Sequence, residues 1–154
     1  MKWILPGAIA LALCLPPIPA NAQQSSNTTR QQCEAALNNA ENILVNNRHL
    51  WIVDTRTSSM EDVGYQRYPQ GRSVALDLVI AGNAVESVMN SPQLLTSISQ
   101  SIMQTCPGVG LVSFGVDQTD WGITFGWIGN RARKFECVDP GDGDTNSWGY
   151  VTCL

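Results

Sequence analysis

Hydrophobic positions recur with a helical period in two parts of the chain. After a polar leader, Thr28 or Thr29 is placed to cap a helix that runs to about Val45. Its apolar stripe consists of Cys33, Ala36, Leu37, Ala40 and Leu44. A second helix is predicted after Ser91-Pro92, which combine an N-cap residue with proline at the first helical position. Its stripe consists of Leu94, Leu95, Ile98, Ile102 and Cys106, and Pro107-Gly108 ends it.

Elsewhere the apolar period is two, which is typical of strands. Two strands are predicted between the helices, at residues 49–55 and 73–80, with a short helical turn at 83–89. Four more follow the second helix, at residues 109–116, 121–128, 131–138 and 148–153. Residues 56–72 have no clear period, and only a short strand near 63–68 is indicated there. This order predicts an α+β fold, a mostly antiparallel sheet with two helices packed on one face.

The dipeptide Gly129-Asn130 predicts a two-residue hairpin turn, because it lies between two apolar runs. Ile128 then lies opposite Arg131, and counting outward pairs residues 121–127 with residues 132–138. One face of this hairpin holds Trp121, Ile123, Phe125 and Trp127 together with Ala132, Lys134, Glu136 and Val138.

The pattern leaves open which face of the hairpin meets the helices. In one arrangement the aromatic side chains of residues 121–127 are core, and Lys134 and Glu136 reach solvent past a sheet edge. In the other, Phe135 and Cys137 face inward and an aromatic ridge is exposed, which normally marks a binding site. The candidate ligand-binding ridge consists of Trp121, Phe125, Trp127, Lys134 and Glu136.

The first 22 residues have the pattern of a secretory signal. Lys2 precedes an apolar run that is too short to span a bilayer, and Ala20-Asn21-Ala22 supplies the small residues that signal peptidase accepts. We therefore expect cleavage between Ala22 and Gln23, leaving residues 23–154 as one domain in the periplasm or outside the cell. A lipoprotein anchored at Cys14 is disfavoured because Leu13, not a small residue, precedes the cysteine. No later stretch approaches the roughly 18 apolar residues of a membrane span.

Four cysteines remain after this cleavage, which in an exported chain indicates two disulfides. Cys137 and Cys153 flank a turn-rich loop and can face each other across a hairpin. Cys33 and Cys106 then pair, since both lie on the apolar stripes of their helices. A zinc site is disfavoured because the chain has no Cys-x-x-Cys pair and one histidine, His49.

Composition and charge exclude several classes of protein. The 154 residues have 44% hydrophobic and 14% charged side chains, which excludes a charge-rich disordered chain. With 9 Lys and Arg against 13 Asp and Glu, the net charge is −4, which argues against a nucleic-acid partner.

The catalytic and metal-binding motifs fail on spacing. Ser113 lies inside a strand without the Gly-x-Ser-x-Gly turn, and nothing in the sequence brings His49 to a serine with Asp54 or Asp77. Glu61-Asp62 lies in the stretch without a period, where acidic residues are ordinarily solvated. The acidic loop 139–146 lacks the EF-hand glycine and glutamate, so a Gly/Asp turn is favoured over a calcium site. We assign no catalytic residue, cofactor or metal ligand.

The C-terminal half contains a set of short motifs at residues 111–115, Asp120-Trp121, Phe125-Gly126, and residues 134–138 and 148–150. In these motifs it resembles small exported cyanobacterial proteins of uncharacterised function. It implies export and a shared fold, and it transfers no activity, ligand or catalytic residue. The sequence therefore favours a non-catalytic binding domain with an unknown ligand or protein partner. The alternatives are a small secreted hydrolase and a structural, envelope-associated protein.

Overall fold

A computed structural model describes residues 20–46, 48–139 and 147–153, with side chains from residue 27 onward. The helices are α1 (Ala20–Val45), α2 (Val85–Met89) and α3 (Pro92–Thr105). The strands are β1 (Leu50–Ser59), β2 (Val74–Gly82), β3 (Val109–Val116), β4 (Gly122–Ile128), β5 (Arg131–Lys134), β6 (Glu136–Val138) and β7 (Tyr150–Thr152). None of the helices within these ranges is long and apolar enough to cross a membrane.

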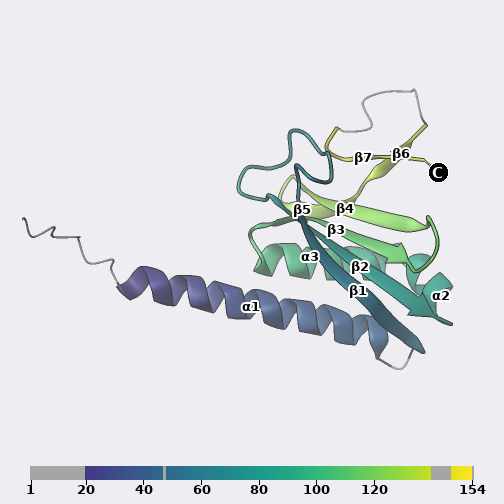
Figure 1. The fold of residues 1–154 in the computed structure, drawn as a ribbon, viewed down its shortest axis with the longest axis horizontal. Coiled ribbons are helices and arrows are strands. Elements are labelled where there is room, and N and C mark those ends of the chain that lie inside the picture. Colours follow the sequence, from purple (N-terminus) through teal and green to yellow (C-terminus); the bar gives the residue numbers. More distant parts are fainter. Residues whose placement is uncertain (1–19, 47, 140–146, 154) are drawn as a thin grey trace, which may run out of the picture.

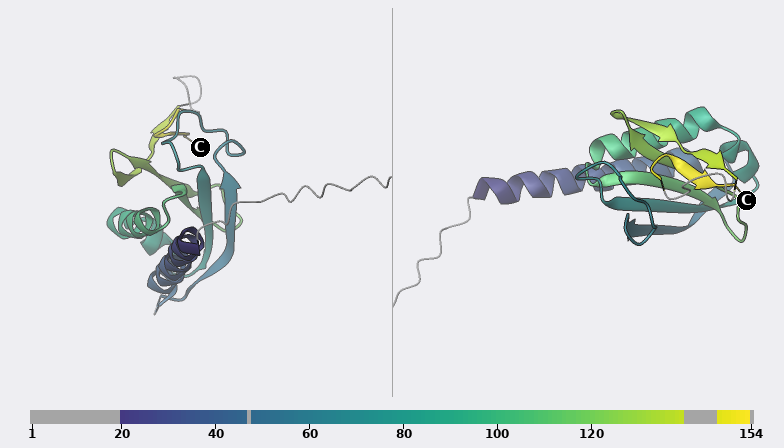
Figure 2. Two further views of the ribbon diagram at one scale, coloured as in Figure 1. Left: turned by 90° about the vertical axis from the view of Figure 1, so that its left-hand side faces the viewer. Right: turned by 90° about the horizontal axis from the view of Figure 1, so that it is seen from above.

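Strands β1 to β5 form one sheet in sequence order, antiparallel except between β2 and β3. A parallel pair needs a crossover, and here α2 and α3 supply it. Helices α1 and α3 lie side by side on one face of the sheet, and the N-terminal part of α1 extends past it (Figure 1, Figure 2). The predicted α+β architecture, with its mostly antiparallel sheet and two helices on one face, is confirmed.

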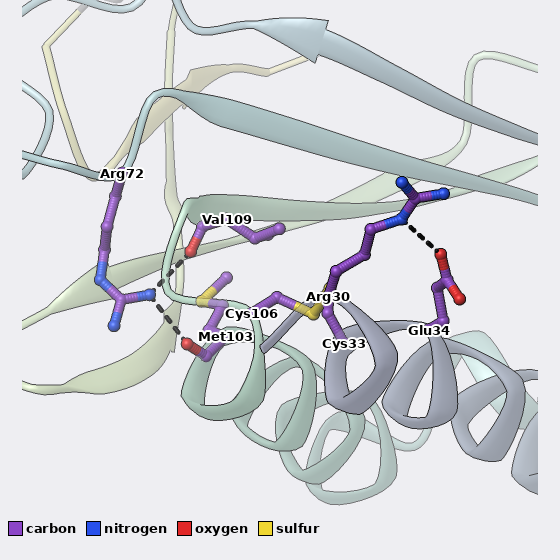
Figure 3. The surroundings of a disulfide bond; sticks show 7 residues. All are labelled: Arg30, Cys33, Glu34, Arg72, Met103, Cys106 and Val109. Atoms are coloured by element: carbon purple, nitrogen blue, oxygen red, sulfur yellow. Dashed lines mark hydrogen bonds and ion pairs between the residues drawn. A yellow bond between two sulfur atoms is a disulfide. The ribbon is translucent and has the colours of Figure 1, made fainter. Parts of the chain in front are cut away.

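The main core lies between the helices and the sheet, because the apolar stripes of both helices face the apolar side of the strands. Ala40 and Leu44 of α1 are buried there, and the rings of Phe114 and Phe125 meet edge to face at 6.0 Å. The predicted Cys33–Cys106 disulfide joins α1 to α3, with 4.8 Å between the Cα atoms (Figure 3).

One predicted helix start is wrong and the other is confirmed. Helix α1 begins at Ala20, so the expected cap at Thr28 or Thr29 is wrong, and the bond from Ala22 to Gln23 lies inside the helix. Ser91 does occupy the N-cap position of α3 with Pro92 following it, but its side chain makes no capping hydrogen bond.

A second, smaller core covers part of the opposite face of the sheet. Met60, Ala75, Leu111 and Phe135 are buried in it. The Phe135 ring lies 5.0 Å from that of Trp148 and 5.4 Å from that of Tyr65, both edge to face. No strand forms at residues 63–68, where the only bridge joins Gln66 to Ser147. The short strand predicted there is wrong because Tyr65 packs into this core instead.

The C-terminal strands differ from the predicted pattern. The hairpin register is confirmed from Ile128–Arg131 to Phe125–Lys134, and Gly129 and Asn130 both have the positive φ of the predicted turn. Beyond Lys134 the predicted strand divides, and β6 pairs with β7 in parallel rather than as a hairpin. The Cys137–Cys153 disulfide nevertheless forms, with Cα atoms 5.1 Å apart.

Candidate functional site

The division between β5 and β6 opens a groove in the surface. It encloses about 860 Å³, open to solvent, between the first residues of β4 and the small β6–β7 sheet. Trp121, Gly122 and Thr124 line one wall. Lys134, Glu136, Thr152 and the Cys137–Cys153 disulfide line the other. The volume lies in the range of small-ligand sites in proteins.

The groove forms because the chain changes partner strands at Phe135. The Phe135 N–H still donates to the Thr124 carbonyl at 2.8 Å, which continues the β4–β5 register by one residue. The next N–H, of Glu136, donates to the Gly149 carbonyl at 2.8 Å and so joins the chain to β7. Burial of the Phe135 side chain in the second core holds this turn in place. Within the described part of the chain, the start of β4 is therefore left with a free edge.

Strand geometry fixes which backbone groups line that edge. The Val116 N–H donates to the Trp121 carbonyl at 2.9 Å, so the backbone of Trp121 faces β3. Because successive residues of an antiparallel strand face opposite sides, the N–H and C=O of Gly122 point into the groove. On the other wall, Glu136 and Val138 bond to the β7 side. The backbone of Cys137 between them therefore faces away from β7, toward the groove.

The five residues of the predicted ridge divide into two groups. Phe125 is fully buried against the helices, and Trp127 packs on the same core with the Arg72 guanidinium 4.0 Å from its ring centroid. Trp121 is 40% exposed, and Lys134 and Glu136 are exposed. The arrangement in which these aromatic side chains face the helices is therefore the observed one. A continuous exposed ridge does not form, but Trp121, Lys134 and Glu136 meet at the groove.

Arg72 explains why Trp127 is held inside the fold. Its guanidinium donates to the carbonyls of Met103 at 2.9 Å and Val109 at 2.7 Å, which lie at the end of α3 and the start of β3 (Figure 3). Burial lowers the pKa of Arg72 from its usual range. A cation over an aromatic face adds attraction beyond packing, so Trp127 serves the fold rather than the surface.

A polar row crosses the sheet on the face opposite the helices and ends at the groove. Arg56, Asp77, Ser113 and Thr124 occupy adjacent register positions on β1 to β4. The hydroxyl oxygens of Ser113 and Thr124 are 3.2 Å apart, and Asp77 accepts a hydrogen bond from Ser113. Burial raises the pKa of Asp77, against the opposing effects of Ser113 and the Arg56 charge. The groove wall at Thr124 therefore has the polar side chain of Ser113 next to it.

The histidine does not meet the carboxylates that were considered with it. His49 is exposed just before β1, whereas Asp77 lies opposite Arg56, seven positions further along. At about 3.3 Å per strand residue this separates them by roughly 20 Å. Asp54 instead accepts a hydrogen bond from Arg56 at 2.6 Å, and that bond holds its pKa below the usual value.

The other candidate sites considered from the sequence give no assembled chemistry in the described ranges. Glu61 and Asp62 are exposed in the turn after β1. Across residues 20–46, 48–139 and 147–153, no cluster of three or more His, Cys, Asp or Glu side chains could hold a metal ion. Of the proposed calcium loop at 139–146, residues 140–146 lie outside the described residues.

Several residues of this region are not found by sequence reasoning. Tyr65 and Trp148 shape the second core. Tyr65 lies in a stretch without a usable period, and the strand predicted at residues 148–153 does not indicate that Trp148 contacts Phe135. One sequence signal does mark the free edge at Gly122: within residues 131–138 the apolar positions change parity, from Ala132 to Phe135 and Cys137. Comparison with known proteins identifies no matching family, curated protein or solved structure. The resemblance to exported cyanobacterial proteins stays a prediction.

Proposed function

We propose that this chain is a non-catalytic binding domain whose ligand lies in the groove between β4 and the β6–β7 sheet. The observation that supports this most strongly is the coincidence of three features there. The groove has a suitable volume, an aromatic side chain at Trp121 and free backbone groups at Gly122. Large, rigid aromatic side chains supply much of the binding energy in small sites.

The hydrolase alternative is less well supported by the same groove. Two carboxylates, Asp120 and Glu136, line it, and paired carboxylates can cleave glycosides. Both are exposed, however, whereas the general acid of such enzymes depends on an apolar pocket. A nucleophile with a neighbouring histidine is absent from the described part of the groove, since His49 lies elsewhere.

We place this domain outside the cytoplasm, in the periplasm or beyond the cell. The two disulfides support an oxidising environment, where such bonds form and persist. The apolar run before Ala20-Asn21-Ala22 supports delivery by a cleaved signal, with Gln23 as the first mature residue.

Chemical-shift mapping tests the proposed function. The oxidised mature protein, labelled with ¹⁵N, is titrated separately with a tryptic peptide mixture and with a set of β-linked oligosaccharides. We expect one probe class to shift the amides of Gly122, Glu136 and Thr152 and the indole N–H of Trp121. The matched control is Trp51, which is 55% exposed on β1 and does not line the groove, so its indole should not move. Shifts confined to other surfaces would contradict the proposal.

A further inference from the structure

From the geometry of the groove we infer the class of its ligand, an inference that rests on the proposed function. We propose that the groove takes a short peptide in extended conformation, which adds to the free edge of β4 as a further strand. An exposed strand edge recognises a peptide through main-chain hydrogen bonds, and the flanking walls select its side chains.

The backbone groups in the groove suit a peptide better than another ligand of similar size. Gly122 presents an N–H donor and a C=O acceptor side by side, the pattern that one residue of an added strand completes. The Phe135–Thr124 hydrogen bond closes the groove at one end, at the position where the sheet divides. A peptide entering from the open end continues the register with β4 that the chain leaves after Phe135.

The side chains of the walls add charge complementarity. Lys134 and Glu136 carry opposite charges two residues apart, and both line the groove. Side chains two residues apart on an extended peptide share a face and are separated by about 7 Å. A peptide with an acidic and a basic residue at such positions can pair with both, while Trp121 packs on a third side chain. A uniformly anionic ligand would meet Asp120 and Glu136 as well as Lys134.

Gly122 offers a matched pair of substitutions. A Cβ atom added there would lie 3.5 Å from the Phe114 carbonyl oxygen, an ordinary contact, so Gly122→Ala keeps the N–H without strain. Gly122→Pro removes that N–H and leaves the hydrogen bond from the Val116 N–H to the Trp121 carbonyl in place, as proline is tolerated on an edge whose N–H faces outward. The two variants therefore separate loss of the donor from loss of the glycine.

The experiment selects linear peptides from a phage-displayed library on the oxidised protein and measures their affinity by calorimetry. Selected peptides should shift the amides of Gly122 and Cys137. Gly122→Pro should weaken the affinity by about fivefold for the one hydrogen bond lost, and Gly122→Ala, which keeps that N–H, should weaken it less. Trp51→Ala, outside the groove, should retain the parent affinity. Methylating the peptide nitrogens one at a time should weaken binding most at one position, the nitrogen whose N–H pairs with the Gly122 carbonyl.

The outcomes distinguish this inference from the proposed function beneath it. If peptides shift the groove amides but no N-methylated peptide binds more weakly than its parent, strand addition is overturned and the groove remains a binding site. If oligosaccharides shift those amides and peptides do not, the peptide class is overturned. If neither class shifts them, both proposals fail. The N-methylated peptides keep the test decisive even if Gly122→Pro does not fold.

Discussion

At the scale of single residues, Asp77 shows how a carboxylate is held on the open face of the sheet. It lies half-buried between Arg56 and Ser113, within reach of the Tyr65 phenol, whose own pKa is raised by burial and by the Asp77 charge. Burial disfavours the charged form of a carboxyl, so folding raises the pKa of Asp77 above its ordinary value of 3.8. Its ionisation therefore opposes folding.

The pH dependence of stability tests this assignment. Between pH 3.8 and the raised pKa of Asp77, the folded state binds more protons than the unfolded state. The contribution of Asp77 to stability therefore falls as pH rises through that window. Asp77→Asn should remove the fall and leave the free energy of unfolding at neutral pH unchanged or higher. Urea titrations of the parent and the variant over a pH series measure the free energy of unfolding at each pH. Asp54, whose pKa is lowered, contributes to stability with the opposite pH dependence, and it does so equally in the parent protein and in Asp77→Asn. If the free energy of unfolding has the same pH slope in both proteins, the assignment to Asp77 is refuted.

The two disulfides differ in exposure and should differ in their rate of reduction. Cys106 is 2% exposed in the main core, whereas Cys137 is exposed at the groove. Exchange with a thiol requires access to a sulfur atom, so limited dithiothreitol should open Cys137–Cys153 first. Alkylation of the freed thiols followed by peptide mass spectrometry reports the order. Early labelling of Cys33 and Cys106 would be the contrary result.

At the scale of elements, the two ends of β4 have different surroundings, and its glycines have different roles. A Cβ atom at Gly126 would overlap the Phe135 ring and lie 2.9 Å from Trp148, so this glycine makes room for the second core. At Gly122 a Cβ atom meets only the Phe114 carbonyl oxygen, at 3.5 Å. The first half of β4 has an edge that faces the groove, whereas the second half pairs with β5 and packs against a core on each face.

A pair of alanine substitutions in β4 tests that difference. Gly126→Ala forces two aromatic rings to move and should destabilise the protein by about 1–3 kcal/mol, as overpacking does. Gly122→Ala should change the free energy of unfolding by less than about 0.5 kcal/mol, which is typical of surface sites. Chemical denaturation of the two variants measures both values. Equal effects would mean that the second core is not packed as described.

Local pattern predicted most of these elements, for identifiable reasons. The stripe of α3 and the alternation of β3 reflect burial on one face, and Gly129-Asn130 adopts the positive φ values that its turn requires. Local pattern did not predict the end of β5, because the change of parity from Ala132 to Phe135 and Cys137 does not by itself show that a strand stops there. What ends that strand is the contact of Phe135 with Tyr65 and Trp148, residues distant in sequence. The groove depends on that contact, so the local pattern did not predict the groove either.

At the scale of the whole molecule, two cores hold the sheet from both sides, and the groove opens at the boundary of the smaller one. The Cys33–Cys106 disulfide links the two helices on one side of the sheet, and Cys137–Cys153 links β6 to the residue after β7 beside the groove. A disulfide in a domain of this size typically stabilises it by about 2–4 kcal/mol. Such bonds form and persist in an oxidising environment, which supports the location proposed for this domain.

The proposed export with signal cleavage predicts the mass of the whole molecule. Secreted protein from an expressing cell should begin at Gln23, and cyclisation of that residue to pyroglutamate would remove one ammonia. Intact-mass analysis with and without reduction also counts the two disulfides. A mature chain that begins at Cys14 with attached lipid, or one that retains residues 1–22, would contradict the predicted cleavage.

The claim that the groove binds a ligand is tested most directly by two tryptophan variants. Trp121→Ala should weaken a groove-binding peptide at least tenfold, since an aromatic anchor typically contributes 2 kcal/mol or more, and leave Tm almost unchanged. Trp127→Ala should lower the free energy of unfolding by about 3 kcal/mol, because it removes core packing and the partner of Arg72. Peptide affinity and Tm, measured on both variants, distinguish the binding role of Trp121 from the packing role of Trp127. Full affinity in a well-folded Trp121→Ala protein would contradict the account.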